Sequence, residues 1–255
     1  MIDIHAHILP GLDDGAQSME DTLGLAELAV ESHVDTLVAT PHCNQRGRFE
    51  NYWSDALSKQ FQQVRDEFQR QRIPLTLLPG MEIFASKDMC AKMDCEQLIG
   101  LNHTRYYLVE FPFDEAPDQI GESLEEILSR GCIALIAHPE RYFCVQEHPF
   151  LVYQWIQMGC RTQVNKGSIL GRFGRHAART ADTLLRYELV TCVASDAHSP
   201  YTRTTFLGDV ADYLSQWFGD GCVYELLEEN PAKIIRGTPI RMHARLPERK
   251  RRFFL

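Results

Sequence analysis

The sequence lacks the patterns that mark secreted, membrane-spanning or disulfide-stapled proteins. No apolar run is long enough to span a bilayer, and the N-terminus, Met1-Ile2-Asp3-Ile4-His5, has no basic region followed by an apolar stretch. The eight cysteines form no C-x-x-C pair, and a chain of 255 residues does not need disulfides to fold. We therefore expect a cytoplasmic protein with reduced thiols and no membrane insertion.

The chain is also short of positive charge and of nucleotide-binding motifs. It has 26 Lys and Arg against 35 Asp and Glu, and this net charge of −9 argues against general nucleic-acid binding, which depends on neutralising phosphates. There is no G-x-x-x-x-G-K-[S/T] loop of the kind that holds phosphates in NTPases. We expect neither a nucleic-acid partner nor a kinase or NTPase.

What the sequence does contain is a regular alternation of short apolar runs with amphipathic helical stretches. With 44% apolar and 24% charged residues, the chain can bury a large core, and no linker or repeat divides it. The alternation is typical of an α/β fold with a mainly parallel sheet. The predicted strands cover Ile2–Ile8, Thr36–Thr40, Leu75–Ile83, Tyr106–Phe111, Cys132–Ala137, Arg161–Val164 and Val190–Ser195. We predict one domain over residues 1–240.

The last segment, 241–255, differs in charge from the rest of the chain. It carries six basic residues and one acidic residue, +5, which leaves −9 − 5 = −14 for residues 1–240. Two interpretations stay open for this basic tail. It is either a solvated segment that aids solubility or an electrostatic contact with an acidic partner or with anionic lipid headgroups.

Nearly every predicted strand ends in a histidine or an acidic residue. The first strand carries His5 and His7, and because alternate residues of a strand face the same side, both imidazoles can reach one metal ion. Ser195-Asp196-Ala197-His198 repeats this spacing after the seventh strand. The strands between them end in His42, Glu82, Glu110 and His138. The carboxyl ends of parallel strands meet at one edge, so these side chains are expected to converge there.

The ligand types indicate the kind of metal. Imidazoles and carboxylates without a thiolate cluster suit divalent ions such as Mn²⁺, Fe²⁺ or Zn²⁺. Five histidines and up to four acidic residues exceed what one ion needs, so we expect a multinuclear site. Of the adjacent Asp13 and Asp14, one is a further ligand at the mouth of this site. The histidines without such context, His33, His103, His148, His176 and His243, are interpreted as structural or surface residues.

These motifs resemble the PHP (polymerase and histidinol phosphatase) superfamily. More narrowly, D-I-H-x-H-I-L-P-G-L-D-D-G-A, A-T-P-H, G-M-E-I, V-E-F, A-H-P-E-R-Y and S-D-A-H look like the bacterial manganese-dependent protein-tyrosine phosphatases of capsule and exopolysaccharide synthesis. The resemblance covers roughly residues 1–203 and continues more loosely towards Gly237. It implies a distorted (β/α)₇ barrel of the PHP type with three metal ions at its mouth. Mn²⁺ is the implied ion, with Fe²⁺, Zn²⁺ or Mg²⁺ as alternatives.

The resemblance also implies a role for each residue. It selects Asp14 over Asp13 and matches Arg141 and Arg203 to phosphate-binding arginines, with a weaker match around Arg203. The implied ligands are His5, His7, Glu82 and Asp196 for a first ion, Glu82, Glu110 and His138 for a second, and Asp14, His42 and His198 for a third.

The implied reaction is hydrolysis of phosphotyrosine in proteins by in-line attack of a metal-bridging hydroxide on phosphorus. The implied substrate is the tail of a membrane-associated bacterial tyrosine kinase that regulates polysaccharide export. A thiol mechanism is disfavoured because none of the eight cysteines is followed six positions later by arginine. Two alternatives remain: a small-molecule phosphatase such as histidinol-phosphatase, and a non-catalytic binding module on the same fold.

Overall fold

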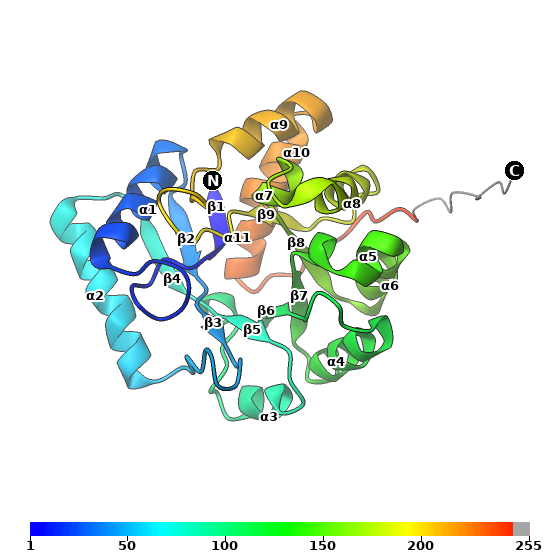
Figure 1. Cartoon of the computed structure of the whole chain (residues 1–255), viewed down its shortest axis with the longest axis horizontal. Helices are drawn as coiled ribbons and strands as arrows, with labels where there is room; N and C mark the ends of the chain where they lie inside the picture. The colour runs from blue at the N-terminus through cyan, green and yellow to red at the C-terminus, as the bar shows by residue number, and fades with distance from the viewer. Residues whose placement is uncertain (247–255) are drawn as a thin grey trace, which may run out of the picture.

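The computed structural model describes residues 1–246, which form a ring of parallel strands surrounded by helices (Figure 1). The strands are β1 Ile2–Ala6, β2 Thr36–Ala39, β3 His42–Cys43, β4 Thr76–Pro79, β5 Glu82–Phe84, β6 Tyr106–Glu110, β7 Ile133–Ala137, β8 Arg161–Asn165 and β9 Cys192–Ala194. The α-helices are α1 Met19–Glu31, α2 Asp55–Gln71, α3 Met89–Asp94, α4 Pro117–Ser129, α5 Phe143–Glu147, α6 Phe150–Met158, α7 Lys166–Ile169, α8 Gly174–Arg186, α9 Gly208–Phe218, α10 Asp220–Tyr224 and α11 Asn230–Ile235. Three short turns of other helix types are η1 Leu101–His103, η2 Pro139–Arg141 and η3 Glu225–Glu229.

The strands pair in two sheets that together make seven positions of a barrel. One sheet has the order β1-β2-β4 and the other β3-β5-β6-β7-β8-β9, and every pairing is parallel. Backbone hydrogen bonds from Asp196 N to His5 O (2.9 Å) and from His7 N to Ala197 O (2.8 Å) join β1 to the chain after β9. The predicted distorted (β/α)₇ barrel is confirmed.

Two of the seven positions are broken, where the sequence predicted continuous strands. The predicted strand Thr36–Thr40 ends as β2 at Ala39, and a separate β3 begins after Pro41, which has no N–H to donate. The predicted strand Leu75–Ile83 splits into β4 and β5 at Gly80. A Cβ at Gly80 would lie 2.8 Å from side-chain carbons of Leu101 and Val38, so a larger residue here would displace these buried side chains.

Apolar packing holds the helices to the outside of the ring and fills its lower interior. Helix α2 buries Leu57, Phe61, Val64 and Phe68, a spacing of three to four residues that forms one face. It begins at Ser54, whose side chain accepts a hydrogen bond from Leu57 N (3.3 Å). Inside the ring, a second cluster from several strands is fully buried, including Ile4, Val38, Leu108, Leu135 and Ala194.

The chain after α11 covers the N-terminal ends of the strands. Thr238 O accepts a hydrogen bond from the Tyr106 hydroxyl (2.7 Å), Ile240 is buried in the interior cluster, and Arg245 N donates to Tyr187 O (2.8 Å). The first residues of the predicted basic tail, 241–246, therefore lie against the barrel. Residues 247–255, with most of the tail's charge, lie outside the described residues. Over residues 1–246, no helix has the length and apolar character required to cross a bilayer.

Candidate metal centre

The C-terminal ends of the strands bring the predicted ligands together at one rim of the barrel. His5 comes from β1 and His7 directly follows it, while His42 comes from β3, Glu82 from β5 and Glu110 from β6. His138, Asp196 and His198 follow β7 and β9, and Asp14 lies in the loop after β1. Three groups have one potential ligand atom per residue, all within 4.8 Å of one another: His5, His7, Glu82 and Asp196; His7, Asp14, His42 and His198; and His42, Glu82 and Glu110.

Glu82 lies at the centre of this cluster. Its Oε2 is 3.2 Å from the Nε2 atoms of both His5 and His7 and 3.0 Å from His42 Nδ1. Its other oxygen, Oε1, is 2.9 Å from His138 Nε2. A carboxylate that faces four imidazoles from two oxygens is in position to bridge two ions.

The donor geometry fits bound cations better than a hydrogen-bonded network. His5 Nε2 and His7 Nε2 are 3.3 Å apart, close to the separation of about 3.4 Å expected for two nitrogens that each lie about 2.1 Å from one tetrahedral ion. Within residues 1–246, Glu82 Oε2 and His42 Nδ1 are buried and have no well-oriented hydrogen-bond partner. Buried polar atoms normally have partners, so these orphans point to cations that would occupy the space between them.

The second predicted ligand set differs partly from the geometry. The compact group around Glu110 contains His42, whose Nδ1 is 3.1 Å from Glu110 Oε1. His138 Nε2 is 3.8 Å from Glu110 Oε2, although it contacts Glu82. His42 thus faces both the second and the third predicted sets, whereas the resemblance gave it to the third alone.

Asp13, which the sequence analysis set aside, holds His7. Its Oδ2 accepts from His7 Nδ1 (2.7 Å) and from His42 N (2.8 Å), and its Oδ1 accepts from Gly15 N (2.9 Å). A Cβ at Gly15 would lie 2.2 Å from His7 O, so only glycine lets the loop pack this closely. The bond to Nδ1 leaves Nε2 of His7 free to face the cluster, as is usual for histidines that bind metals.

Two amide side chains of β8 support the cluster in the same way. Gln163 Oε1 accepts from His5 Nδ1 (2.8 Å), and Gln163 Nε2 donates to Asn165 Oδ1 (2.8 Å). Asn165 Nδ2 in turn donates to Asp196 Oδ2. Sequence reasoning missed both residues because it searched strand ends for charged ligands. The signal was present, since Gln163 and Asn165 have the same i, i+2 spacing as His5 and His7.

The carboxylates and imidazoles at the centre shift one another's pKa values. Burial raises the pKa of Glu82, but His5 and His42 beside it outweigh burial and hold the pKa well below the usual value. Burial lowers the pKa of His7, but the charge and hydrogen bond of Asp13 raise it well above the ordinary value. The carboxylates therefore stay ionised, which is the form that binds cations.

Two of the candidate ligands have a strained backbone. His138 has φ 34° and Asp196 has φ 50°, in the left-handed region that non-glycine residues rarely adopt. For His138 the strain is greater because Pro139 follows it. Such conformations persist only where surrounding structure imposes them, and they cluster at functional sites.

The two predicted arginines reach the edge of the cluster. Arg203 Nη2 lies 2.5 Å from Asp196 Oδ2, and Arg141 Nη1 lies 3.9 Å from the same oxygen. The guanidinium of Arg141 lies 4.4 Å from the ring centre of Phe113 and 4.5 Å from that of Phe173. Arg203 lies 5.5 Å from the Phe173 ring. The two phenyl rings hold the arginines in place beside a surface where an anion can approach.

The remaining histidines and the cysteines contribute nothing to this rim. His33, His103, His148, His176 and His243 belong to none of the three groups, and unlike His138, which is also outside these groups, they do not contact Glu82. Burial raises the pKa of the Cys43 and Cys160 thiols to about 12, so neither is an activated thiolate.

A parallel α/β barrel that gathers imidazoles and carboxylates at the C-terminal ends of its strands defines the class of barrel metallohydrolases. Within that class, the chain belongs to the CpsB/CapC family, described as capsular polysaccharide synthesis, whose model matches residues 1–236. The resemblance found in the sequence motifs is confirmed.

Named relatives and a solved structure agree over the whole chain. It is 35% identical over 254 residues to the tyrosine-protein phosphatase YwqE of Bacillus subtilis, covering 100% of this chain and 99% of the relative. It is 33% identical to the tyrosine-protein phosphatase CpsB of Streptococcus pneumoniae, covering 92% and 98%. A chain from the crystal structures of YwqE and CpsB, described as metal-dependent tyrosine phosphatases, superposes with a TM-score of 0.90 at 34% identity, covering 98% of this chain and 100% of that chain.

Proposed function

We propose that the chain hydrolyses phosphotyrosine in a protein substrate, as a metal-dependent protein-tyrosine phosphatase. The observation that carries the proposal is the rim itself, where Glu82 and eight other candidate ligands come together and two arginines reach Asp196 beside them. Relatives that are 33–35% identical to this chain over nearly its whole length carry the name tyrosine-protein phosphatase.

In this proposal the chain binds three divalent ions, and Mn²⁺ is preferred because the sequence motifs resemble those of manganese-dependent phosphatases. The sets would be His5, His7, Glu82 and Asp196; Glu82, Glu110 and His138; and Asp14, His42 and His198, with His42 close enough to serve the second set as well. When bound, such ions lower the pKa of water to about 7 and neutralise charge on the phosphoryl group. Nitrogen and oxygen donors without thiolates suit Mn²⁺, Fe²⁺ and Zn²⁺.

The residues of the chain bind and orient the phosphate ester. Arg141 and Arg203 donate charge-assisted hydrogen bonds to equatorial oxygens of the phosphoryl group. Asp13 and Gln163 fix the rings of His7 and His5, so the donor nitrogens do not have to reorganise during the reaction. A phenol has a pKa of about 10 and leaves more readily than an alcohol, which favours phosphotyrosine over phosphoserine.

The natural substrate in this proposal is the phosphorylated tail of a tyrosine kinase that regulates capsular or exopolysaccharide synthesis. The kinase is associated with the membrane, and the chain acts on it from the cytoplasm. The family's description supports the pathway, and the relatives' names support the reaction. The predicted tail over 241–255 is the part of the chain suited to an acidic surface, and most of its basic residues lie beyond Leu246.

Turnover of a phosphotyrosine peptide and of histidinol phosphate by the same metal-loaded preparation tests the assignment. We expect a large preference for the peptide, its loss on chelation, and restoration that is greatest with Mn²⁺. A large preference for histidinol phosphate, or full turnover in the demetallated protein, would contradict the proposal. A loaded protein that hydrolyses no aryl phosphate would favour a non-catalytic binding module.

A further inference from the structure

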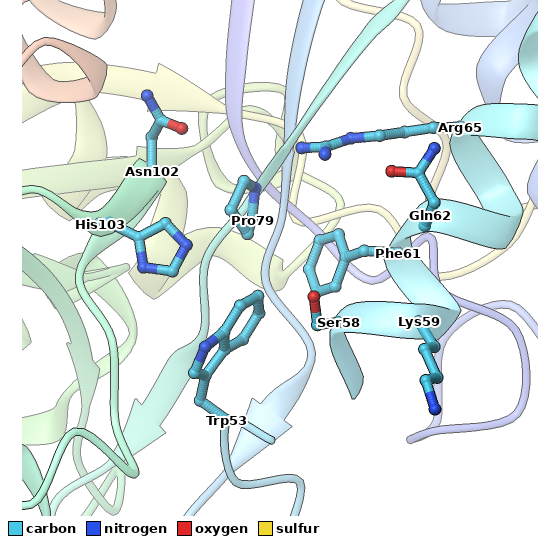
Figure 2. A pocket seen from close by; sticks show the side chains of 9 residues that line it. All are labelled: Trp53, Ser58, Lys59, Phe61, Gln62, Arg65, Pro79, Asn102 and His103. Atoms are coloured by element: carbon cyan, nitrogen blue, oxygen red, sulfur yellow. The ribbon is translucent and has the colours of Figure 1, made fainter. Parts of the chain in front are cut away.

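A second cavity lies on the outer wall of the barrel, away from the candidate metal ligands. Its volume is about 410 Å³, within the range of roughly 300–1,000 Å³ typical of small-ligand sites. Figure 2 shows it between α2, which contributes Phe61 and Arg65, and the turn η1, which contributes Asn102 and His103. Trp53, just before α2, lies beside them. We call this cavity the outer pocket.

The outer pocket exists because the barrel wall is interrupted there. Strand β4 pairs with β2 on one side only, while β6 pairs with β5 and β7. The turn η1 lies next to β4 in place of a strand, and its Asn102 and His103 both have positive φ angles, 51° and 57°. Two consecutive non-glycine residues in this conformation are strained, which is typical of functional sites.

The polar groups of the outer pocket are cationic or neutral. Its lining contains Lys59, Arg65 and His103 but no carboxylate. None of these three side chains forms an ion pair within residues 1–246. Arg65 Nε donates to Leu77 O (2.9 Å), which fixes the guanidinium while its two terminal nitrogens remain available. Residues 1–240 carry a net charge of −14, so a pocket whose ionisable groups are all basic differs from most of the surface. Such a pocket favours an anion.

The aromatic groups add a flat surface next to these cations. The indole of Trp53 is half-buried and meets His103 edge to face, with ring centres 5.0 Å apart and planes at 80°. It also packs against Phe61 at 5.8 Å. An indole held on two sides can stack with a planar ring without losing much conformational freedom.

We propose that the outer pocket is a second binding site, which takes an aromatic ring carrying a phosphate group. Trp53 stacks on the ring, and Arg65 and His103 bind the phosphate from opposite sides of the cavity. A nucleotide carries its phosphate on the ribose and not on the base, so it is an alternative outcome of the test. The ring is the phenol of a phosphotyrosine side chain, an assignment that rests on the proposed function. In that case a doubly phosphorylated protein would be held at the outer wall while its other phosphotyrosine is at the rim, which raises the effective concentration of substrate.

Titration calorimetry of the metal-loaded full chain with phenylphosphonate, which cannot be hydrolysed, tests the proposal. We expect two binding sites per chain. Arg65→Gln should weaken one of them by about tenfold or more, the usual effect of losing a charge-assisted hydrogen bond, and Trp53→Leu should weaken the same one. Arg70→Gln is the matched control, because Arg70 is on the same helix but is paired with Glu67 and lies outside the pocket.

A single site that Arg141→Gln weakens and Arg65→Gln leaves unchanged, or two sites of unchanged affinity in both pocket variants, would overturn the proposal. A single site that Arg65→Gln weakens and Arg141→Gln leaves unchanged would instead contradict the proposed function, because the rim would then not bind the phosphonate. Inorganic phosphate that binds the outer pocket as tightly as phenylphosphonate would overturn the role of the ring. Two further probes, adenosine monophosphate and a phosphonate analogue of phosphotyrosine, then identify the ligand. The one that binds the outer pocket is the one whose affinity falls in Arg65→Gln.

Discussion

The two ends of the barrel are built from the same strands but differ in what fills them. At the C-terminal rim, His5, Glu82 and Asp196 are buried and face one another, and amides or carboxylates outside them fix their orientation. At the N-terminal end, the interior holds apolar side chains such as Ile4 and Leu135, and the chain from Thr238 to Leu246 covers it.

The two ends contribute oppositely to the stability of the fold: the rim that would carry out the reaction destabilises it, and the apolar end stabilises it. A rim that buries carboxylates and imidazoles together is unfavourable until cations occupy it. The apolar end supplies burial that offsets this cost. We therefore expect substitutions at the rim to reduce metal binding and catalysis, and substitutions at the other end to reduce the free energy of unfolding.

The largest effect is expected for His5→Ala. His5 contributes to the group with His7, Glu82 and Asp196, so its loss should lower bound metal and turnover together, down to the level of the demetallated protein. Elemental analysis and phosphotyrosine-peptide hydrolysis on one preparation measure both. His33→Ala, outside the site, is the control. Full metal content with normal turnover in His5→Ala would show that the rim does not work as described.

The sequence predicts the C-terminal side of this contrast because the rim follows from strand geometry. The spacing of His5 and His7, and of Asp196 and His198, indicates side chains on one face, and parallel strands bring these faces to one rim. The start of α1 follows from a local pattern too, since Ser18 directly precedes the helix and its side chain accepts from Asp21 N (3.2 Å). In these cases the alternation of side chains along a strand and the preference for serine at a helix start are enough to predict the structure.

The sequence could not predict what depends on contacts between distant residues. The break at Gly80 arises where the chain passes the buried side chains of Leu101 and Val38. The role of Asp13 depends on a loop that folds back onto His7, and a local rule sees only ordinary turn chemistry there. The burial of Ile240 depends on a segment returning to strands that lie far from it in the chain.

Arg141→Ala should separate binding of phosphate from binding of metal. The guanidinium lies beside Asp196 but in none of the ligand groups, so the metals should remain. Loss of one donor to the transferring group should lower turnover by about 100- to 1,000-fold. Elemental analysis and steady-state kinetics check the two parts. Metal loss equal to that of His5→Ala would remove the distinction between the roles.

Asp13→Ala tests whether residues outside the ligand groups orient the rim. His7 and the backbone N–H of His42 lose their acceptor, so we expect metal affinity or activity to fall by about 10- to 100-fold. Asp13→Asn keeps an acceptor oxygen and should recover part of the loss. Competition with a chelator measures the affinity. Equal losses in the two variants would assign the effect to the negative charge of Asp13 instead of its hydrogen bonds.

Ile240→Val tests the opposite end of the barrel. Ile240 is 2% exposed within the interior apolar cluster, so removing one methylene should cost about 0.5–1.5 kcal/mol of the free energy of unfolding. Denaturant unfolding measures this change, and turnover per folded molecule should remain the same. A loss of turnover without a loss of stability would mean that the two ends are coupled through the strands.

Phe173→Leu has the smallest expected effect and refines the description of the rim. The Phe173 ring lies against both Arg141 and Arg203, so its loss frees two guanidiniums while every candidate ligand stays in place. A cation–π contact at such a site contributes about 0.5–1 kcal/mol, so KM for an aryl phosphate should rise by about two- to fivefold with metal content unchanged. Phe143→Leu is the matched control, because Phe143 is 56% exposed and forms none of these arginine contacts. A rise in KM for both variants would indicate a general effect of surface phenylalanines, whereas a fall in kcat alone would place Phe173 in the reaction step instead of in phosphate binding.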